Sequence, residues 1–304
     1  MNPEEYLTIK PGDISVPKFH HYLLGAVAPR PIAFASTVDK EGNVNLSPFS
    51  FFNVFGANPP IMIFSPARRG RDNTTKHTFE NVKEVKEVVI NIVNYSIVEQ
   101  MSLASTEYDK GVNEFVKSGL TPVASEIVTP PRVGESPVAF ECKVNEVVET
   151  GTEGGAGNLI ICEVLKMHIK KSVLDENDSI DIKKIDLVAR MGGNWYCRAN
   201  GDALFEIAKP LTTKGIGVDA MPGHVKNSSI LTGNDLGKLG NVESLPDQSA
   251  IDDFGVNDPE IVSLKNQHGD QPDEYRKFLH LLAQKYLNSN EVEEAWLTLL
   301  QKND

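Results

Sequence analysis

Cationic and hydroxyl side chains gather in residues 68–78, RRGRDNTTKHT, directly before a segment with helical character. The first turn of a helix has backbone N–H groups without intrahelical partners and a partial positive charge, so it suits a phosphate group. Lys76 and Thr78 stand at this helix start and could donate to phosphate oxygens, with the arginines of the stretch nearby. The alternative is that Thr78 only caps the helix and the arginines are solvated. The residues alone do not decide between these interpretations.

A second polar cluster lies within residues 45–66, NLSPFSFFNVFGANPPIMIFSP, where Ser47 and Ser50 alternate with phenylalanines. A strand of this kind could offer the apolar faces and the hydrogen-bonding groups that a flat aromatic ligand such as an isoalloxazine ring needs. The alternative is an edge strand whose phenylalanines are core residues, as aromatic residues in strands usually are.

A third cluster joins Arg30 to Ser36 and Thr37 in the segment APRPIAFAST. Other chemistry finds little support. The seven histidines lack the HxxxH or HExxH spacing of a zinc site, so no metal is expected. The three cysteines include no CxxC pair and are expected to be reduced. Residues 151–158, GTEGGAGN, lack the GK[ST] ending of a phosphate-binding loop and are better interpreted as a hairpin loop.

The charge of the chain argues against nucleic-acid and membrane partners. The chain has 304 residues and a net charge of −12, and such a surface would repel both nucleic acid and an anionic membrane. No apolar run approaches the ~20 residues of a membrane span. The acidic beginning, MNPEEYLTIKPGD, lacks the basic and apolar regions of a signal peptide. A cytoplasmic location is therefore expected.

The first two thirds of the chain are dominated by short strand patterns separated by Gly and Pro turns. Many short strands with few long helices indicate a mainly β barrel or sandwich rather than a doubly wound sheet. Strands are expected at 31–38, 44–53, 59–65, 88–93, 138–148 and 159–169, and helices at 79–86 and 97–104.

The sequence changes character from about residue 211. Residues 211–246 are rich in Gly, Asn and Ser with little periodicity, which indicates an irregular arm. Two amphipathic helices follow, because apolar residues recur at three- and four-residue steps from Tyr275 to Tyr286 and again from Val292 to Leu300. We expect a helical hairpin that packs on the barrel or on another subunit, with Trp296 as a core residue.

The predicted domains are 1–208 and 209–304. The second domain could cap a ligand pocket of the first, or its Asn-, Asp- and Gly-rich turns could be purely structural. The turn-forming composition favours the structural role.

Several segments, in matching order over residues 15–205, resemble the flavin reductase-like, FMN-binding split-barrel family. They are PRPIAFASTVDKEGNVNLSPFSFFN, PPIMIFSP, KHTFENVKEVKEVVINIVN and, at 189–196, ARMGGNWY. The resemblance implies a Greek-key split β-barrel with peripheral helices, usually a homodimer, that binds FMN non-covalently. His77 departs from the commoner Asp between Lys76 and Thr78, which leaves the two phosphate donors in place.

The resemblance also assigns roles to residues. Lys76 and Thr78 would hold the 5′-phosphate, and Arg30 would lie near the flavin or brace a loop. Arg190 and Tyr196 are weaker assignments and would approach the ring from the dimer side. The isoalloxazine would be bordered by Ser47, Pro48, Phe49 and Ser50, with Ser36 and Thr37 on the neighbouring strand.

The expected function is hydride transfer from NAD(P)H to the flavin, with electrons passing on to free flavin, a partner oxygenase or ferric iron. Flavin chemistry belongs mostly to the cofactor, so no catalytic acid or base is required. Arg30 or Arg190 could stabilise negative charge at the flavin N1. Two alternatives remain: a flavoredoxin-like FMN electron carrier that exchanges electrons with a protein, and a non-flavin interaction protein. NADH and NADPH are not distinguished.

Overall fold

The protein, as a computed structural model, is described over residues 6–207 and 209–302 and forms two compact units. The first unit ends at Phe205 and the second begins at Glu206. Each unit has its own hydrophobic core and is described by itself. The predicted boundary residue 208 and the first five residues of the acidic beginning lie outside the described residues.

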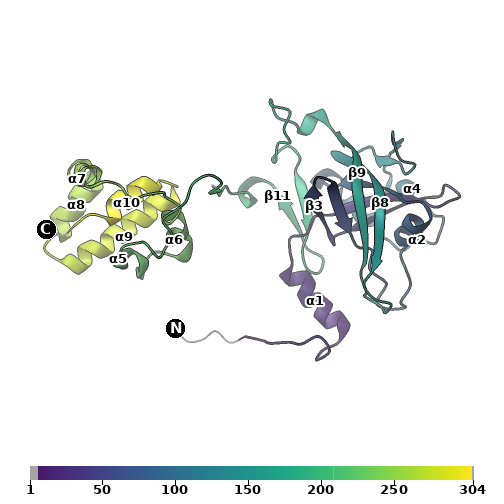
Figure 1. Ribbon diagram of the computed structural model, residues 1–304, viewed down its shortest axis with the longest axis horizontal. Coiled ribbons are helices and arrows are strands. Elements are labelled where there is room, and N and C mark those ends of the chain that lie inside the picture. Colours follow the sequence, from purple (N-terminus) through teal and green to yellow (C-terminus); the bar gives the residue numbers. More distant parts are fainter. Residues whose placement is uncertain (1–5, 208, 303–304) are drawn as a thin grey trace. The chain divides into compact units, whose positions relative to one another are not determined.

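The first unit is built on a seven-stranded antiparallel sheet with the strand order β2-β1-β5-β8-β9-β4-β3 (Figure 1). β2 and β3 lie at opposite ends of this order, although only Ser50 and Phe51 separate them in the chain. The sheet must therefore curl until its two edges come close, which makes a barrel that is open at one seam. The strands are β1 (Ala33–Val38), β2 (Val44–Phe49), β3 (Phe52–Ala57), β4 (Pro60–Phe64), β5 (Glu87–Ile92), β8 (Val138–Glu149) and β9 (Asn158–Ile169).

Peripheral helices and two short strand pairs, β6–β7 and β10–β11, complete the described part of the first unit. The predicted helices are found as α2 and α3, and the hairpin loop predicted at 151–158 joins β8 to β9. The strand predicted over 44–53 is interrupted after Phe49, and α1 was not predicted. The remaining elements are α1 (Val16–Ala26), α2 (His77–Glu84), α3 (Val98–Leu103), α4 (Glu114–Ser118), β6 (Pro122–Val123), β7 (Arg132–Val133), β10 (Leu187–Arg190) and β11 (Tyr196–Ala199).

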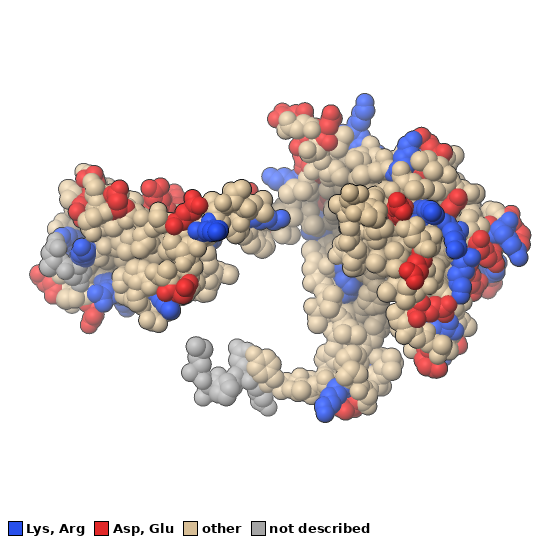
Figure 2. Space-filling model, viewed as in Figure 1, with Lys and Arg blue, Asp and Glu red and all other residues tan. Residues whose placement is uncertain are grey.

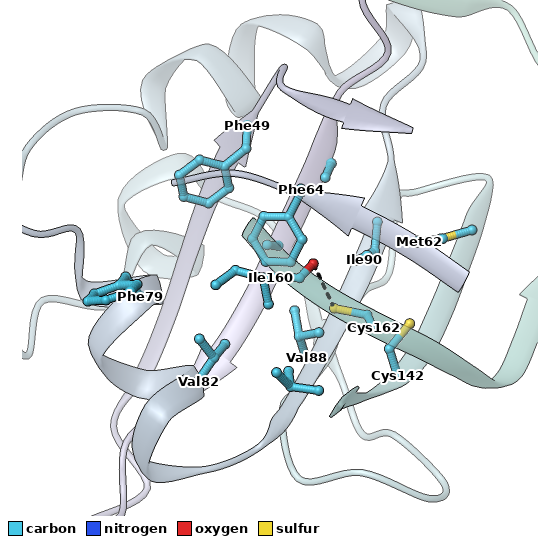
Figure 3. Close-up of a cluster of buried hydrophobic side chains, with 13 residues drawn as sticks. Phe49, Met62, Phe64, Phe79, Val82, Val88, Ile90, Cys142, Ile160 and Cys162 are labelled. Carbon is cyan, nitrogen blue, oxygen red and sulfur yellow. Dashed lines mark hydrogen bonds between the residues drawn. The ribbon is translucent and has the colours of Figure 1, made fainter. Parts of the chain in front are cut away.

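The core of the first unit lies inside the curled sheet (Figure 3). Every residue of β1 is buried, because alternate side chains enter two clusters: Ala33 and Ala35 face the inner core, and Phe34 packs with Leu46 on the other face. The Cys142 thiol belongs to the inner core, where burial raises its pKa to about 12, with a smaller contribution from the neighbouring acid. This cysteine therefore acts as a small apolar residue rather than a nucleophile.

Over its described residues, 206–207 and 209–302, the second unit has only helices as regular structure. The predicted helices are found as α9 (Pro272–Asn288) and α10 (Val292–Leu299), and Trp296 is fully buried as predicted. The irregular arm was predicted wrongly in part, because it contains two short helices, and two further helices follow it. These are α5 (Gly223–Lys226), α6 (Gly233–Leu239), α7 (Gln248–Asn257) and α8 (Pro259–His268).

A capping box explains why α6 forms in a glycine-rich segment. The Thr232 hydroxyl accepts from the Asp235 N–H at 3.2 Å, and the Asp235 carboxylate accepts from the Thr232 N–H at 2.7 Å. Two N–H groups that a helix start leaves unpaired are thereby satisfied. α9 and α10 pack against helices of their own unit and share a core with Val225 and Leu239, so they are part of a larger bundle than the predicted hairpin.

The second unit should lose stability in mild acid because of His280. Its Nδ1 lies 2.7 Å from the Ser228 hydroxyl, and burial, followed by the charges of His224 and Arg276, lowers the pKa of His280 to about 4. In the unfolded chain His280 binds a proton below pH ~6.5, whereas in the folded chain it binds one only below about pH 4. Stability therefore falls as pH falls through this window. We expect a loss of about 1.5 kcal/mol between pH 7 and pH 5.

Urea unfolding followed by helical circular dichroism at the two pH values measures this loss. The variant His280→Gln removes the titrating group and should show a clearly smaller difference. An equal pH dependence in both proteins would show that another group is responsible.

Candidate functional site

A polar hollow opens beside the start of α2 in the first unit. Three of the predicted site residues, Ser47, Lys76 and Thr78, line it together although they come from separate segments of the chain. The other lining residues are Asn45, Arg69, His77, Ser105, Thr106, Glu107, Tyr108 and Glu114. The edge of β2, the turn before α2 and the loop after α3 therefore meet at one place. Most of these side chains can donate hydrogen bonds, as a phosphate requires.

The capping role predicted for Thr78 is wrong. α2 begins at His77, two residues before the predicted start, and Lys76 is its N-cap residue with extended backbone. Thr78 lies inside the first turn and is fully buried. Its hydroxyl accepts from the Asn45 side-chain amide at 2.9 Å, so it ties the helix start to β2. Lys76 is thus the residue placed at the positive end of the helix.

The loop before α2 is held in a tight turn by its own side chains. Asn73 has a positive φ of 59°, a conformation that Asn tolerates better than most residues. The Arg68 guanidinium donates to the Asn73 side chain at 2.7 Å, and the Arg69 N–H donates to the Thr74 carbonyl at 2.9 Å. Arg68 is therefore used inside the turn, whereas Arg69 also reaches the hollow.

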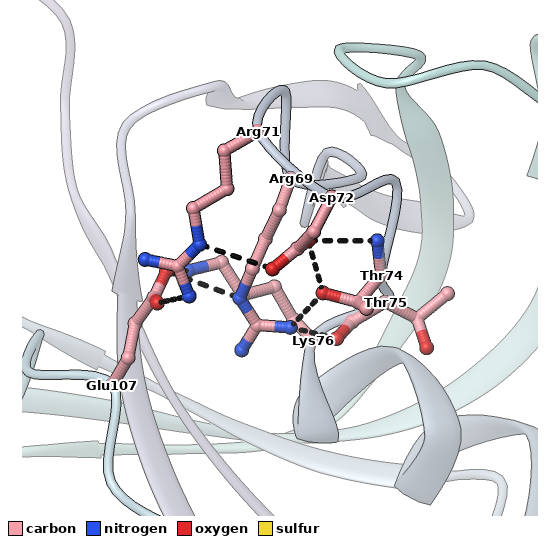
Figure 4. Close-up of polar contacts among 7 residues, drawn as sticks. All are labelled: Arg69, Arg71, Asp72, Thr74, Thr75, Lys76 and Glu107. Atoms are coloured by element: carbon pink, nitrogen blue, oxygen red, sulfur yellow. Dashed lines mark hydrogen bonds and ion pairs between the residues drawn. The ribbon is translucent and has the colours of Figure 1, made fainter.

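A network of opposite charges occupies the rim of the hollow (Figure 4). The Glu107 carboxylate pairs with Arg69 Nε at 3.0 Å, with Lys76 Nζ at 3.4 Å, and with the Arg71 guanidinium. Burial alone would raise the pKa of Glu107, but the hydrogen bonds and charges of Arg69 and Lys76 hold that pKa below its usual value. Glu107 is therefore ionised at neutral pH. On the face seen in Figure 2, acidic and basic side chains are interspersed in the same way.

The predicted ring-binding residues have different environments. Ser47 lines the hollow and Pro48 is half-buried, whereas the Phe49 ring is buried in the core, 5.5 Å from the Phe64 ring. On β1 both predicted hydroxyls are fully buried. Thr37 accepts from the Asn81 amide at 3.1 Å, and the Ser36 hydroxyl has no partner among the described residues. Phe49, Ser36 and Thr37 are therefore buried and do not line the hollow.

Arg30 is a brace. Its guanidinium donates to the carbonyl oxygens of Leu24 at 2.6 Å and Met191 at 3.0 Å, to that of Val27, and at 3.5 Å to the Ser50 hydroxyl. Burial, followed by the charge of Arg190, lowers the pKa of Arg30. Of the two expected roles, bracing is the one that these contacts favour, because the donors already point at carbonyl oxygens.

Arg190 lies beside Arg30 on β10. The backbones of the two arginines exchange hydrogen bonds of 2.9 and 2.8 Å, and the Arg190 guanidinium lies over the Tyr196 ring, 4.6 Å from its centre. Neither Arg190 nor Tyr196 lines the hollow. The predicted residues therefore divide into a group at the hollow and a group, Arg30, Arg190 and Tyr196, at the β10–β11 pair.

Replacing Arg30 with glutamine should lower the free energy of unfolding of the first unit by about 2–3 kcal/mol, because three partly buried hydrogen bonds to carbonyl oxygens lose their charged donor. Arg198→Gln is the matched control, since Arg198 pairs with Asp186 at 2.8 Å on the surface and should cost less than about 1 kcal/mol. Urea unfolding measures both. Equal small losses would exclude the bracing role.

Six residues of the hollow were not predicted: Asn45, Ser105, Thr106, Glu107, Tyr108 and Glu114. Asn45 lies on β2, in the same segment as the predicted Ser47. Glu114, at the start of α4, is buried and accepts from the Leu46 N–H at 2.9 Å, and burial raises its pKa. Glu107 and Glu114 stand in a stretch without any spacing signal. Among the described residues no group of three or more His, Cys, Asp or Glu is arranged to hold a metal ion.

Known proteins share the fold of the first unit. Residues 25–184 match the model of the flavin reductase like domain. An uncharacterised protein of Aquifex aeolicus is 39% identical over 185 residues, which cover 61% of this chain and 92% of that protein. Within residues 6–207 and 209–302, none of the helices has the length and apolar character needed to span a bilayer.

Two solved structures agree with the family match. Nitrilotriacetate monooxygenase component B from Bacillus cereus is 28% identical, with a TM-score of 0.62, over 67% of this chain and 100% of that chain. A protein with a split barrel domain from Shewanella frigidimarina is 30% identical, with a TM-score of 0.55, over 65% of this chain and 94% of that chain. Because the family model matches more than half of the residues, this chain belongs to the flavin reductase like family, a family of flavin oxidoreductases with a mainly β, split-barrel fold.

Proposed function

We propose that the protein binds FMN non-covalently and transfers hydride from NAD(P)H to it as a flavin reductase. The observation that carries this proposal is the convergence of Ser47, Lys76 and Thr78 at one polar hollow, at the start of a helix. Membership of a family of flavin oxidoreductases supports a bound flavin. The donors of the hollow support FMN rather than riboflavin, because FMN carries a phosphate.

The residues present fit a phosphate monoester. Lys76 offers an ammonium group at the helix start, and the hydroxyls of Ser47, Ser105 and Thr106 line the same space. The ring system would lie along the stretch from Ser47 to Ser50. There the core behind it, which includes Phe49, keeps the strand rigid.

The protein binds and orients the reactants in this proposal. When bound, FMN supplies the redox chemistry by accepting a hydride from the nicotinamide. Lys76 would hold the phosphate, and Arg30 keeps the β2–β3 connection in place through Ser50. No side chain would have to transfer a proton in the hydride step. The electron acceptors that we propose are free flavin, a partner oxygenase or ferric iron. The name of the Bacillus cereus protein, a monooxygenase component, favours an oxygenase partner.

We also propose that the first unit forms a homodimer through α1 and β3. None of the residues of α1 is buried, although the helix carries Tyr22 and Leu23, and β3 exposes Val54 and Phe55. The surface over α1 is largely uncharged in Figure 2. The His20 ring of α1 packs edge-on against the Phe51 ring, with the ring centres 6.0 Å apart. This contact connects the exposed apolar residues of α1 with those of β3. Light scattering in solution would give twice the monomer mass.

An anaerobic absorbance experiment tests the proposed function. The purified protein is mixed with FMN, separated from free FMN, and treated with NADH or NADPH in turn. A flavin spectrum that bleaches rapidly with one nicotinamide supports the reductase. A bound flavin that does not bleach would favour the electron carrier, and a protein that retains no flavin would overturn both.

A further inference from the structure

Glu107 is the acidic residue that the cations of the hollow share. It lies in the loop after α3, and 31 to 38 residues separate it in the chain from the Lys76, Arg71 and Arg69 that it contacts. Its side chain is 34% exposed, so solvent and ligands can reach it. Figure 4 shows the carboxylate between the two guanidinium groups and Lys76. A carboxylate thus takes the place beside Lys76 where the proposed function puts a phosphate.

Lys76 is the cation of this group with spare donor capacity. An ammonium group has three N–H donors, and the contact of Lys76 with Glu107 is long, at 3.4 Å. Arg69 is more fully engaged, because its Nε donates to Glu107 and its Nη1 donates to the Thr74 hydroxyl at 2.9 Å and to the Thr75 carbonyl. Arg71 is shared between Glu107 and Asp72.

A carboxylate and a phosphate compete for the same donors. A phosphate monoester carries a charge of about −1.5 to −2 near pH 7, and a second anion at the same ammonium group is repelled by it. The entry of a phosphate therefore exchanges one anion for another, whereas the entry of a ligand without phosphate leaves the Glu107 pair untouched.

We propose, resting on the function proposed above, that Glu107 is a built-in counter-ion that a ligand phosphate displaces from Lys76. Glu107 keeps the cations neutralised before the ligand arrives and selectively weakens the binding of phosphorylated flavin. It speeds the release of that flavin for the same reason, since the carboxylate returns to the ammonium group. The residue thus sets how readily FMN exchanges.

The test compares the wild type with Glu107→Gln, which keeps the size and removes the charge. FMN and riboflavin are titrated against both proteins by flavin fluorescence, and the rate of FMN dissociation is measured by stopped flow. FMN should bind about three- to fivefold more tightly to Glu107→Gln and leave more slowly, with riboflavin unchanged. Inorganic phosphate should also displace FMN from each protein.

Glu149→Gln is the matched control. Glu149 pairs with Lys83 at 2.9 Å and is absent from the hollow, so this variant changes the net charge equally without touching Lys76. Its affinity for FMN should equal that of the wild type.

The opposite result has a distinct meaning. If Glu107 instead holds Lys76 and Arg69 in position for the ligand, Glu107→Gln will bind FMN equally or more weakly, which overturns the inference while the proposed function stands. A tightening that Glu149→Gln reproduces would also overturn it. Failure of the wild type to bind FMN would overturn the inference and the proposed function together.

Discussion

Replacing Lys76 with methionine should weaken FMN binding by about 10- to 100-fold and leave riboflavin binding unchanged. Charge-assisted hydrogen bonds to phosphate contribute about 1.5–3 kcal/mol, which corresponds to this range. Lys76 is partly exposed and stands at the N-terminus of α2, so its removal should disturb the phosphate end of the hollow without altering the core. Methionine keeps an unbranched, flexible side chain that is one atom shorter, and it removes the charge and the donors.

Parallel titrations of FMN and riboflavin measure the effect. Lys83→Met provides the matched control, because Lys83 belongs to the same helix and pairs with Glu149. Its affinity for FMN should stay within about twofold of the wild type. An equal loss of affinity for both flavins would show that Lys76→Met disturbs the ring site or the fold. An unchanged affinity for FMN would show that its phosphate does not bind in this hollow.

The strands of the first unit were predictable because their signals are local. The turn between β1 and β2 is contained in Asp39 to Asn43. Gly42 has a φ of 86°, and the Asn43 N–H donates to the Asp39 carboxylate at 2.8 Å. The β8–β9 hairpin likewise joins two adjacent alternating segments. What had to be learned from the structure is the order of the strands, which places β2 and β3 at opposite ends of the sheet.

The candidate site was predictable only where one motif carried it. Lys76 and Ser47 belong to short, recognisable segments, so the sequence pointed to both. Glu107 contacts residues more than 30 positions away, and no local spacing encodes such a contact. Thr78 was misread for a related reason. A hydroxyl at a helix start suggests a cap, but the buried Asn45 amide, supplied by a distant strand, engages it instead. The charged and hydroxyl residues of a segment indicate where a site lies. Which of these groups faces the ligand depends on tertiary contacts that the segment does not encode.

The prediction of an irregular arm in the second unit was wrong in part, because tertiary packing overrides composition there. Glycine and asparagine in residues 211–246 indicated irregular chain, yet α6 forms there, because a capping box starts it and Leu239 is buried against α10. Trp296 is the residue that joins these elements, since it is fully buried and its indole N–H donates to the Leu239 carbonyl at 3.0 Å.

Trp296→Ala should therefore lower the free energy of unfolding of the second unit by about 3–5 kcal/mol, because it leaves a large cavity and unpairs a buried carbonyl. Urea unfolding followed by helical circular dichroism measures the change. Trp195→Ala is the matched control, since the other tryptophan of the chain is 77% exposed and its loss should change stability by less than about 0.5 kcal/mol. Trp296→Phe should lower the free energy of unfolding by an amount between those of Trp296→Ala and Trp195→Ala, because phenylalanine restores most of the packing but not the hydrogen bond. A loss below 1 kcal/mol in Trp296→Ala would mean that α6 and α10 do not depend on this contact, and the glycine-rich segment would then need another source of order.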